Sequence, residues 1–506
     1  MILEKTREQI TGTLEELSAN IDYNSKEVAI ILAAGHGKRI KSHKSKMLHS
    51  IWGVPTVERV YNSCTMGNNS MNTIIVVGIK AVDVMKVIGK RERNVFAYQE
   101  VQKGTGHAVQ VALEKLDAGK FDGVVYVLPG DMGLIDPESI QEFKRNFINS
   151  GNDMMVLTGI FDGPVAQNNY GRIIRVKDKD VKGKNSGADE GKVIEIMEHK
   201  DILALAENEP YELEYNGKTY HYSKSELLEN REYNSGVYAF KFRYLMELIF
   251  TLSSDNAQNE IYITDLIYAF NHANHSVGAS SPSKSYVVMG FNDKSVLRDM
   301  ENLFRHNVYE SLKNIIEIDD PEDFFIEEGI VKQIIEMDKK GTPLDIRIGK
   351  GVHLGKGVQL NYDLHLKKHS FIEGGVRFGK GVTIGEYTHI STYPDQIMEL
   401  RDNVQIYSGD MVKGNVILEE NVTIESGVIM TGSDEFPIRI GKNVLIKGTT
   451  YIFGSVIEED VFIEHSIIVK KKVHKIVKRD GEVQKIRFYA PMPAGIDCIE
   501  SIDNKH

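Results

Sequence analysis

The chain has 506 residues, a formal net charge of −11 and 41% hydrophobic residues. This length suffices for two or three domains with complete cores. The acidic balance excludes nucleic acid and an anionic membrane as partners of the whole surface, because like charges repel. The two cysteines, Cys64 and Cys498, indicate a reducing compartment and no disulfide framework.

The sequence contains no apolar run of about 18 residues, the length that a membrane-spanning helix requires. Residues 1–20 are too polar and acidic for a signal peptide, and their composition favours a helix. We therefore expect a cytoplasmic protein with a helical extension over residues 1–26.

Residues 28–49, VAIILAAGHGKRIKSHKSKMLH, combine a strand, small residues and cations. The apolar run 28–32 predicts a buried parallel strand. The small residues that follow let backbone N–H groups approach an anion; they are Ala33, Ala34, Gly35 and Gly37. Five cations then fall within nine residues, namely Lys38, Arg39, Lys41, Lys44 and Lys46. The stretch predicts a phosphate site that is neither a Walker loop nor a dinucleotide fingerprint; a solvated basic loop is the alternative.

Residues 28–300 alternate strand-like and helix-like stretches. The clearest strands are 73–78, 123–128 and 154–160, and the clearest helices are 57–64, 106–116 and 137–147. This alternation predicts a mostly parallel sheet with helices on both faces. Ligands of such sheets bind at the carboxyl ends of the strands, where the glycine loop lies.

Two more segments carry polar groups at such ends. Residues 99–108, QEVQKGTGHA, offer glutamine amides, which present a donor and an acceptor to a base edge; a strand-to-helix turn capped by Thr105 is the alternative. Asp131 ends the apolar run VVYVLPGD, where a carboxylate is costly unless it is paired or metal-bound. A plain Gly-Asp turn is the alternative there.

The segment L-A-A-G-x-G-x-R-x-x-S-x-x-x-K-x-L-H resembles the signature of sugar-phosphate nucleotidyltransferases. It looks most like the bacterial N-acetylglucosamine-1-phosphate uridylyltransferases of the bifunctional type. The resemblance implies that Arg39 and Lys46 hold the triphosphate of UTP. It also implies loop contacts from Leu32, Ala33, Ala34, Gly35 and Gly37. Lys38 and Ser45 replace the usual threonine and proline, and both cations remain.

The same resemblance implies the other subsites. Base recognition falls on Gln99, Gln102, Gly104 and Thr105. Mg²⁺ binding falls on Asp131 and on Asn292 of the segment VMGFN. Sugar binding falls on Gly130, Gly171 of YGR, Glu198 of EHKD and Asn234 of YNSG. Pro129 and Gly133 depart from the family's usual tyrosine and proline, which leaves the sugar-side wall open. Residues 256–265, NAQNEIYITD, match a family segment to which we assign an architectural role.

Residues 202–231 form a stretch longer than the family usually has. Its polar sequence YNGKTYHYSK predicts a hairpin with Asn216 and Gly217 at the turn.

The period of apolar residues changes after Thr342 to one in six, which predicts the hexapeptide repeat of a parallel β-helix. The first run comprises Ile348, Leu354, Leu360, Leu366, Ile372, Phe378, Ile384 and Ile390. The period resumes at Ile406, Val412, Leu418, Ile424 and Met430, then at Ile440, Ile446 and Ile452, and after a slip at Ile457, Ile463 and Val469. The repeats resemble the left-handed β-helix of the same family, in which three chains pack side by side.

The family's β-helix acetylates glucosamine 1-phosphate with a histidine base, and no segment here matches that site. The candidate histidines are His353, His365, His369, His389 and His465. The residues on either side of each do not match those of the family's acetyltransferase site. We therefore expect a helical extension (1–26), an α/β nucleotidyltransferase domain (27–300), a helical linker (301–342), a left-handed β-helix (343–475) and a tail (476–506). The expected reaction forms UDP-N-acetylglucosamine and pyrophosphate from UTP and N-acetylglucosamine 1-phosphate, in a homotrimer with Mg²⁺. Retained acetylation and another sugar 1-phosphate are the alternatives.

Overall fold

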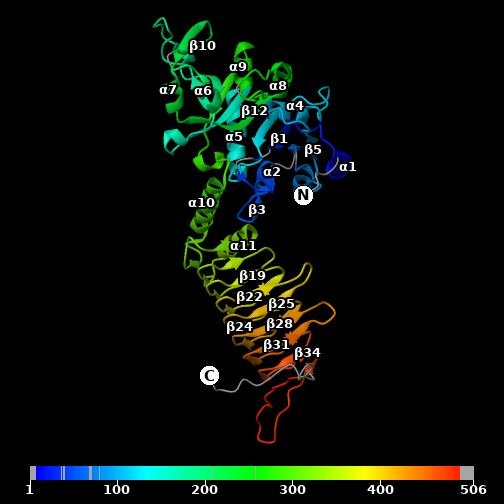
Figure 1. Ribbon diagram of the computed structural model, residues 1–506. Coiled ribbons are helices and arrows are strands. Elements are labelled where there is room, and N and C mark those ends of the chain that lie inside the picture. The colour runs from blue at the N-terminus through cyan, green and yellow to red at the C-terminus, as the bar shows by residue number, and fades with distance from the viewer. Residues whose placement is uncertain are drawn as a thin grey trace, which may run out of the picture. The chain divides into compact units, whose positions relative to one another are not determined.

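The computed structural model describes residues 7–35, 37, 40–67, 71–78, 80–207, 209–256 and 258–489. The chain divides into two compact units, Met1–Glu301 and Asn302–His506. Figure 1 shows the first as an α/β body and the second as stacked coils. No helix in the described ranges is both long and apolar enough to cross a membrane.

The first unit is built on one sheet whose strand order is β13-β7-β12-β6-β1-β4-β5. Its strands are β1 (Glu27–Ala33), β4 (Asn72–Val77), β5 (Asn94–Tyr98), β6 (Val124–Pro129), β7 (Met154–Ile160), β12 (Glu232–Lys241) and β13 (Val277–Ser280). The pairs β1–β4, β1–β6, β4–β5 and β7–β13 are parallel, and β12 runs antiparallel to β6 and β7. The short strands β8 (Arg172–Arg175) and β9 (Val193–Met197) extend the sheet from β12. The predicted, mostly parallel sheet is confirmed.

Helices cover both faces of this sheet. They are α1 (Arg7–Leu17), α2 (Thr56–Thr65), α3 (Ala81–Ile88), α4 (Thr105–Leu113), α5 (Pro137–Ser150), α6 (His199–Ala204), α8 (Phe242–Leu248) and α9 (Asp265–His272). Within β1, Ala29 and Ile31 belong to one hydrophobic core, whereas Val28 and Ile30 belong to a second core on the other face. A strand buried on both faces must be apolar throughout, which explains the unbroken run at 28–32.

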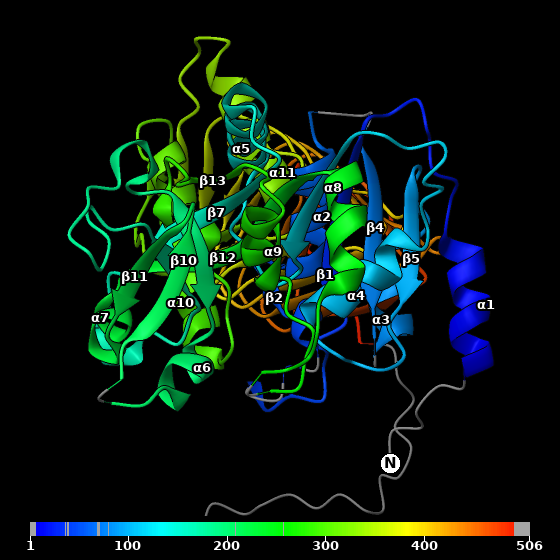
Figure 2. The ribbon, with the colours of Figure 1, turned by 90° about the horizontal axis from the view of Figure 1, so that it is seen from above.

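The segment after α1 lies along β5, the edge strand of the sheet. Figure 2 shows α1 beside β5. The backbone N–H of Ala19 donates to the carbonyl of Asn94 at 2.8 Å, and the N–H of Phe96 donates to the hydroxyl of Ser18 at 3.1 Å. Ile10 of α1 is buried in the core on that face. The helical extension is thus part of the first unit.

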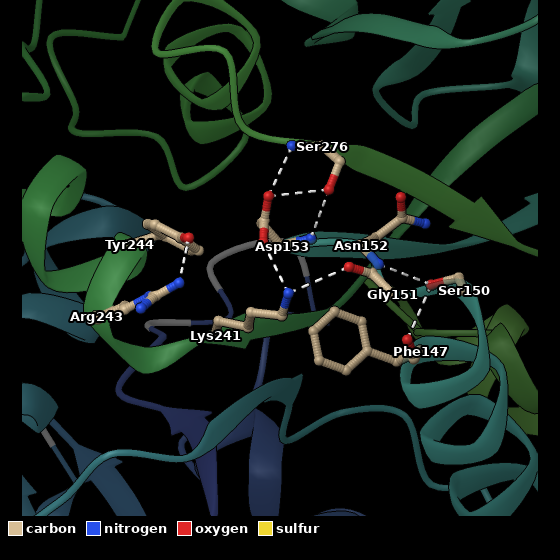
Figure 3. A network of polar contacts seen from close by, with 9 residues as sticks. All are labelled: Phe147, Ser150, Gly151, Asn152, Asp153, Lys241, Arg243, Tyr244 and Ser276. Atoms are coloured by element: carbon tan, nitrogen blue, oxygen red, sulfur yellow. Dashed lines mark hydrogen bonds and ion pairs between the residues drawn. The ribbon is translucent and has the colours of Figure 1, made fainter.

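A polar network joins three strands at the amino end of β7, away from the carboxyl ends of the parallel strands (Figure 3). The Asp153 carboxylate accepts hydrogen bonds from the N–H and the hydroxyl of Ser276, each at 2.9 Å. Lys241 Nζ donates to the same carboxylate at 2.8 Å and to the Gly151 carbonyl at 3.1 Å. These bonds fix the starts of β7 and β13 to the end of β12.

Residues 202–231 contain the predicted hairpin. Strands β10 (Tyr211–Tyr215) and β11 (Lys218–Tyr222) pair antiparallel around Asn216 and Gly217, whose φ angles are 48° and 71°. Positive φ at both central residues is the geometry of the type I′ turn that Asn-Gly favours. The hairpin and α7 (Lys224–Glu229) share a small core of their own with β8 and β9.

The second unit is a prism of three parallel sheets, the left-handed β-helix that the hexads predict. The first sheet comprises β14 (Glu317–Ile318), β16 (Ile346–Ile348), β18 (Leu364–Leu366), β21 (Thr383–Ile384), β24 (Gln405–Ile406), β27 (Thr423–Ile424), β30 (Leu445–Lys447) and β33 (Phe462–Glu464). The second comprises β15 (Phe325–Ile326), β17 (His353–Leu354), β19 (Phe371–Glu373), β22 (His389–Ser391), β25 (Met411–Gly414), β28 (Val428–Gly432), β31 (Thr450–Phe453) and β34 (Ile467–Val469). The third comprises β20 (Val376–Phe378), β23 (Met398–Leu400), β26 (Val416–Leu418), β29 (Ile438–Ile440), β32 (Val456–Ile457) and β35 (Lys472–Val473).

The predicted inward residues from Ile348 to Ile463 are buried, and one prediction is wrong. Val469 is 40% exposed, whereas its neighbour Ile468 is 1% exposed and fills the core. The step from Ile463 to Ile468 is one residue shorter than the hexad that the sequence predicts, and Ile468 pairs with Ile452 of the coil before it. A one-residue slip moves a side chain to the other face of a strand.

Residues 301–342 hold more than a helical linker. α10 (Lys294–Leu312) and α11 (Glu328–Asp338) are helical, but β14 and β15 lie between them. β14 pairs with β16, and β15 pairs with β17. The prism therefore starts about 30 residues before the first clear hexad, as the bounds of β14 and β16 show.

One register position on the second sheet carries a continuous line of aromatic and aliphatic side chains, which we call the outer column. Its members are Phe325, His353, Phe371, His389, Met411, Ile429, Tyr451 and Ile467. The rings of the first four stack at centroid distances of 4.5, 4.5 and 4.8 Å. The last three are 44%, 39% and 38% exposed. The outer column is thus an apolar line on the prism surface.

Candidate active site

A cleft of about 790 Å³ opens at the carboxyl ends of β1, β5 and β6. Most of the residues that the sequence nominates line it together. They are Leu32, Ala34, Gly35, Gly37, Lys46, Gln99, Gln102, Gly104, Thr105, Asp131, Glu198, Asn234 and Asn292. Segments that are up to 260 residues apart in sequence, from Leu32 to Asn292, therefore meet in one cavity.

The glycine loop after β1 approaches the following 3₁₀ turn closely. Gly37 has a φ of 59°, and a Cβ atom there would lie 2.7 Å from Lys46 Cβ, so a side chain does not fit. Ala33 faces an adjoining cavity of about 190 Å³ that Lys44 and Lys80 also line. The predicted triphosphate ligand Arg39 lies outside the described residues.

The Lys46 ammonium group joins the two predicted metal ligands. Lys46 Nζ donates to Asp131 Oδ2 in an ion pair and to Asn292 Oδ1 at 3.0 Å. It also lies 5.3 Å from the centre of the Phe291 ring. Both partners of the ion pair are largely buried, with side-chain exposures of 10% and 14%. A cation and its two oxygen partners are thus held together at the centre of the cleft.

These two oxygen groups fit a hard divalent cation that takes its other ligands from outside the protein. Within the described part of the chain, no group of three or more His, Cys, Asp or Glu residues is placed to hold a metal. Mg²⁺ in phosphoryl-transfer sites is commonly bound by one or two carboxylates, waters and substrate phosphates. Asp131 and Asn292 could supply such a partial set.

The loop that follows β5 is fastened from two sides. Gln99 Nε2 donates to the Gly104 carbonyl at 3.1 Å, and Gln102 Nε2 donates to the Ala34 carbonyl of the glycine loop. Gly104 has a φ of 102°, and a Cβ atom there would lie 2.5 Å from the Ile261 carbonyl oxygen. The loop of residues 99–105, which we call the base loop after its predicted role, and the glycine loop of residues 33–37 therefore form one connected surface.

Three predicted sugar-side residues meet at the other end of the cleft. The Asn234 N–H donates to the Gly171 carbonyl at 2.9 Å, and a Cβ atom on Gly171 would lie 3.2 Å from Glu198 Oε1. A bulge in β12 between Asn234 and Val237 sets this geometry. Gly130 instead supports the wall from behind, since its N–H donates to the Leu32 carbonyl at 3.0 Å.

The Glu198 carboxyl group lies in an acidic environment. Burial, followed by the charges of Asp201, Asp265 and Glu260, raises its pKa to about 7. The Arg172 guanidinium opposes this rise but does not cancel it. Glu198 therefore changes its charge near neutral pH, and with it the hydrogen bonds that it can offer to a ligand.

The comparisons with known proteins agree with this geometry. Residues 29–166 match the MobA-like NTP transferase domain. The bifunctional protein GlmU of Acetivibrio thermocellus is 28% identical over 502 residues, which cover 90% of this chain and 97% of that protein. The bifunctional protein GlmU of Streptococcus agalactiae serotype V is 30% identical over 450 residues, which cover 83% of this chain and 87% of that protein.

The chain belongs to the GlmU family. It is therefore a sugar-1-phosphate uridylyltransferase, with the nucleotidyltransferase fold in its first unit. A solved structure of UDP-glucose pyrophosphorylase with UDP-glucose aligns with 56% of this chain and 99% of its own at 12% identity and a TM-score of 0.37, too low to bear on the fold.

The structure adds residues that sequence reasoning left out of this GlmU-type cleft. Gln258, Glu260, Ile263 and Thr264 line it, although the sequence of their segment indicates an architectural role. They have that role too, since Ile261 N–H donates to the Lys103 carbonyl at 2.7 Å and thereby supports the base loop. The match to NAQNEIYITD is the available signal, but which of its side chains face the cleft depends on contacts across the sheet.

Two other lining residues, Pro129 and Tyr238, come from the paired strands β6 and β12. Gly236 has a φ of 84°, and a Cβ atom there would lie 2.8 Å from Pro129 Cγ. Pro129 therefore packs closely against a glycine at the end of the cleft where we predict the sugar.

Proposed function

We propose that the chain joins UTP and N-acetylglucosamine 1-phosphate to form UDP-N-acetylglucosamine and pyrophosphate. The observation that carries this proposal is the meeting of Lys46, Asp131 and Asn292 in one cleft, with the base loop at one side and Glu198 and Asn234 at the other. Family membership supports the same substrates.

The reaction is an in-line displacement at the α-phosphorus of UTP. The phosphate oxygen of the sugar 1-phosphate forms the new P–O bond, and the bond to the β-phosphate breaks as pyrophosphate leaves. The attacking phosphate is already ionised, so no general base is needed. Positioning and charge neutralisation supply the catalysis. We assign that neutralisation to Lys46 and, from the resemblance, to Arg39.

Asp131 and Asn292 would hold the divalent cation that enzymes of this type use, and we propose that it is Mg²⁺. Bound there, Mg²⁺ would supply positive charge that offsets the charge of the phosphates. Lys46 donates to both of these side chains, so its positive charge lies beside the proposed metal position.

We assign the ends of the cleft from their hydrogen-bonding groups. The base loop with Gln99, Gln102, Gly104 and Thr105 would receive uracil, because an amide matches the donor and acceptor of the pyrimidine edge. Glu198 and Asn234, with Gly171 behind them, would receive the sugar. Gly130 would act by supporting Leu32.

Pyrophosphate release, measured over a panel of nucleotides and sugar phosphates, tests the proposal. We expect UTP to exceed ATP, CTP and GTP, and N-acetylglucosamine 1-phosphate to exceed glucose 1-phosphate and glucosamine 1-phosphate. Release with another sugar phosphate alone would replace the assigned substrate. No release with any pair would point to a protein that binds a UDP-sugar without turnover.

Metal dependence is tested with the same assay. We expect excess EDTA to abolish turnover and Mg²⁺ to restore it. Asp131→Asn should lose most activity at all Mg²⁺ concentrations, because an amide binds a hard cation more weakly than a carboxylate. Full activity in EDTA would exclude the assigned role of Asp131 and Asn292.

We also propose that the β-helix assembles the chain into a homotrimer in the cytoplasm and no longer acetylates. Among the described residues, none of His353, His365, His369, His389 and His465 has a hydrogen bond to a carboxylate that would orient it as a base. His353 and His389 instead lie in the ring stack of the outer column. Acetyl-CoA consumption with glucosamine 1-phosphate should stay at the rate without enzyme; acetylation above it would restore the bifunctional alternative.

A further inference from the structure

Tyr238, in β12, has a buried hydroxyl group without a hydrogen-bond partner. The residue is 0% exposed, yet it lines the cleft. Within the described residues, no group accepts from or donates to its Oη with acceptable distance and angle. Leaving a buried hydroxyl unpaired is unfavourable, so such groups normally have a partner.

The packing of the ring does not explain the hydroxyl. Phe240, two residues further along β12, points to the same face and is also 0% exposed. The two rings lie 5.8 Å apart, centre to centre. A ring without a hydroxyl, Phe240, therefore fills the core further from the cleft, whereas Tyr238, the ring with a hydroxyl, lines the cleft.

The hydroxyl lies at the end of the cleft that Glu198 and Asn234 also line. The Asn234 side chain lies beside the hydroxyl and acts on its pKa as a hydrogen-bond donor to the oxygen, whereas Asn234 Oδ1 accepts the Gly236 N–H at 2.8 Å. This contact leaves the proton of the Tyr238 hydroxyl without an acceptor among the described residues. Burial, with the charge of Glu198, raises the pKa of Tyr238 above its ordinary value. The hydroxyl thus keeps its proton at any working pH and has a hydrogen bond to donate.

We propose that the Tyr238 hydroxyl donates a hydrogen bond to an oxygen atom of the sugar in the bound sugar 1-phosphate. The inference rests on the proposed function, because it takes the sugar to lie between Glu198 and Asn234. Tyr238 then contributes to sugar affinity from the floor of the cleft. It contacts neither the nucleotide nor the reacting phosphates, so its contribution is to binding of one substrate.

Tyr238→Phe tests this role with no change in ring packing. We expect the KM for N-acetylglucosamine 1-phosphate to rise about 3- to 12-fold, the range for one hydrogen bond. The KM for UTP should stay within about twofold of wild type, because the base loop is at the other end. The melting temperature should not fall, since the variant loses no hydrogen bond within the protein.

Tyr222→Phe is the matched control. Tyr222 is 4% exposed, and its hydroxyl donates to the Arg175 carbonyl at 2.8 Å, outside the cleft. This variant should lose thermal stability and keep both KM values, the reverse of the Tyr238 result.

An unchanged sugar-phosphate KM in Tyr238→Phe, with normal wild-type turnover, would overturn the inference and leave the proposed function intact. A fall in melting temperature like that of Tyr222→Phe, with an unchanged KM, would give the hydroxyl a structural role. A wild-type protein that does not use this sugar phosphate would instead refute the proposed function and its sugar subsite together.

Discussion

Lys46 is the residue to which we assign the most direct part in the proposed chemistry of the cleft. Its ammonium group contacts both Asp131 and Asn292, and it is largely buried. We expect Lys46→Ala to lower kcat by about 10²–10³, the usual loss when one preorganised charge-stabilising group is removed. Steady-state pyrophosphate release measures this. Lys41→Ala, at an exposed lysine of the same loop, should be near wild type; equal kinetics in all three proteins would contradict the phosphate site.

Glu198 predicts a pH dependence at the sugar end. Because burial and neighbouring acids raise its pKa to about 7, the carboxyl group is mostly protonated below about pH 7 and mostly ionised above it. We expect kcat/KM for the sugar phosphate to rise with pH through about 7, as an ionised carboxylate accepts the stronger hydrogen bond. Glu198→Gln has no carboxyl group to titrate at this position. The ratio of wild-type to variant kcat/KM, plotted against pH, should therefore rise through about pH 7. A constant ratio would assign the pH dependence to the substrates.

Asp410 predicts a pH dependence of stability in the β-helix. It is 1% exposed, Oδ1 accepts the Val428 N–H at 2.8 Å and Oδ2 has no partner among the described residues. Burial raises the pKa of Asp410 from 3.8 to about 7. The folded state therefore favours the protonated carboxyl, and the contribution of Asp410 to the free energy of unfolding is fully present below about pH 4 and is lost as pH rises to about 7. Asp410→Asn should therefore raise the melting temperature at pH 8 more than at pH 5. An equal shift at both pH values would contradict this.

Among the elements, the base loop depends most on one glycine. Gly104 has a φ of 102°, and a Cβ atom at this position would lie 2.5 Å from the Ile261 carbonyl oxygen, so Gly104→Ala must move the loop. We expect the KM for UTP to rise by about tenfold or more. The reason is that a displaced loop would no longer hold its hydrogen-bonding groups where the base can reach them. Gly151→Ala is the control, because Gly151 has a φ of 69° and open space around it. That variant should lose stability and keep its KM.

The elements also show where sequence reasoning succeeds and where it stops. The strand at 28–32 and the hexads were predictable because burial on both faces, or in every sixth position, leaves a periodic record. The contribution of Thr264 and Tyr238 to the cleft was not predictable, because it depends on which faces of distant segments meet. The two-residue strands β14 and β15 were missed because they are too short to show a period. The inward position of Ile468 was missed because its apolar neighbour Val469 keeps the six-residue step from Ile463.

At the scale of the whole molecule, the outer column predicts how copies of the chain associate. Ile429, Tyr451 and Ile467 are exposed apolar residues in one line, and such surfaces are typical of interaction sites. We expect light scattering to give about three times the chain mass of 57.0 kDa. Tyr451→Glu should shift the mass toward the monomer, because a charge at an interface core is costly.

Gln405→Lys is the control for this substitution, since Gln405 is an exposed outward residue on another sheet. It should leave the mass unchanged. A wild-type monomer, or a Tyr451→Glu protein of unchanged mass, would show that the outer column does not mediate assembly.

The segment around Ser18 and Ala19 has a different effect on association. β5 is the edge of the sheet, and an open edge is a template on which a strand of another molecule can pair. Ser18 and Ala19 occupy backbone groups of Phe96 and Asn94 on that edge, and α1 lies over it. We therefore expect the extension to oppose pairing of this edge with a strand of another molecule.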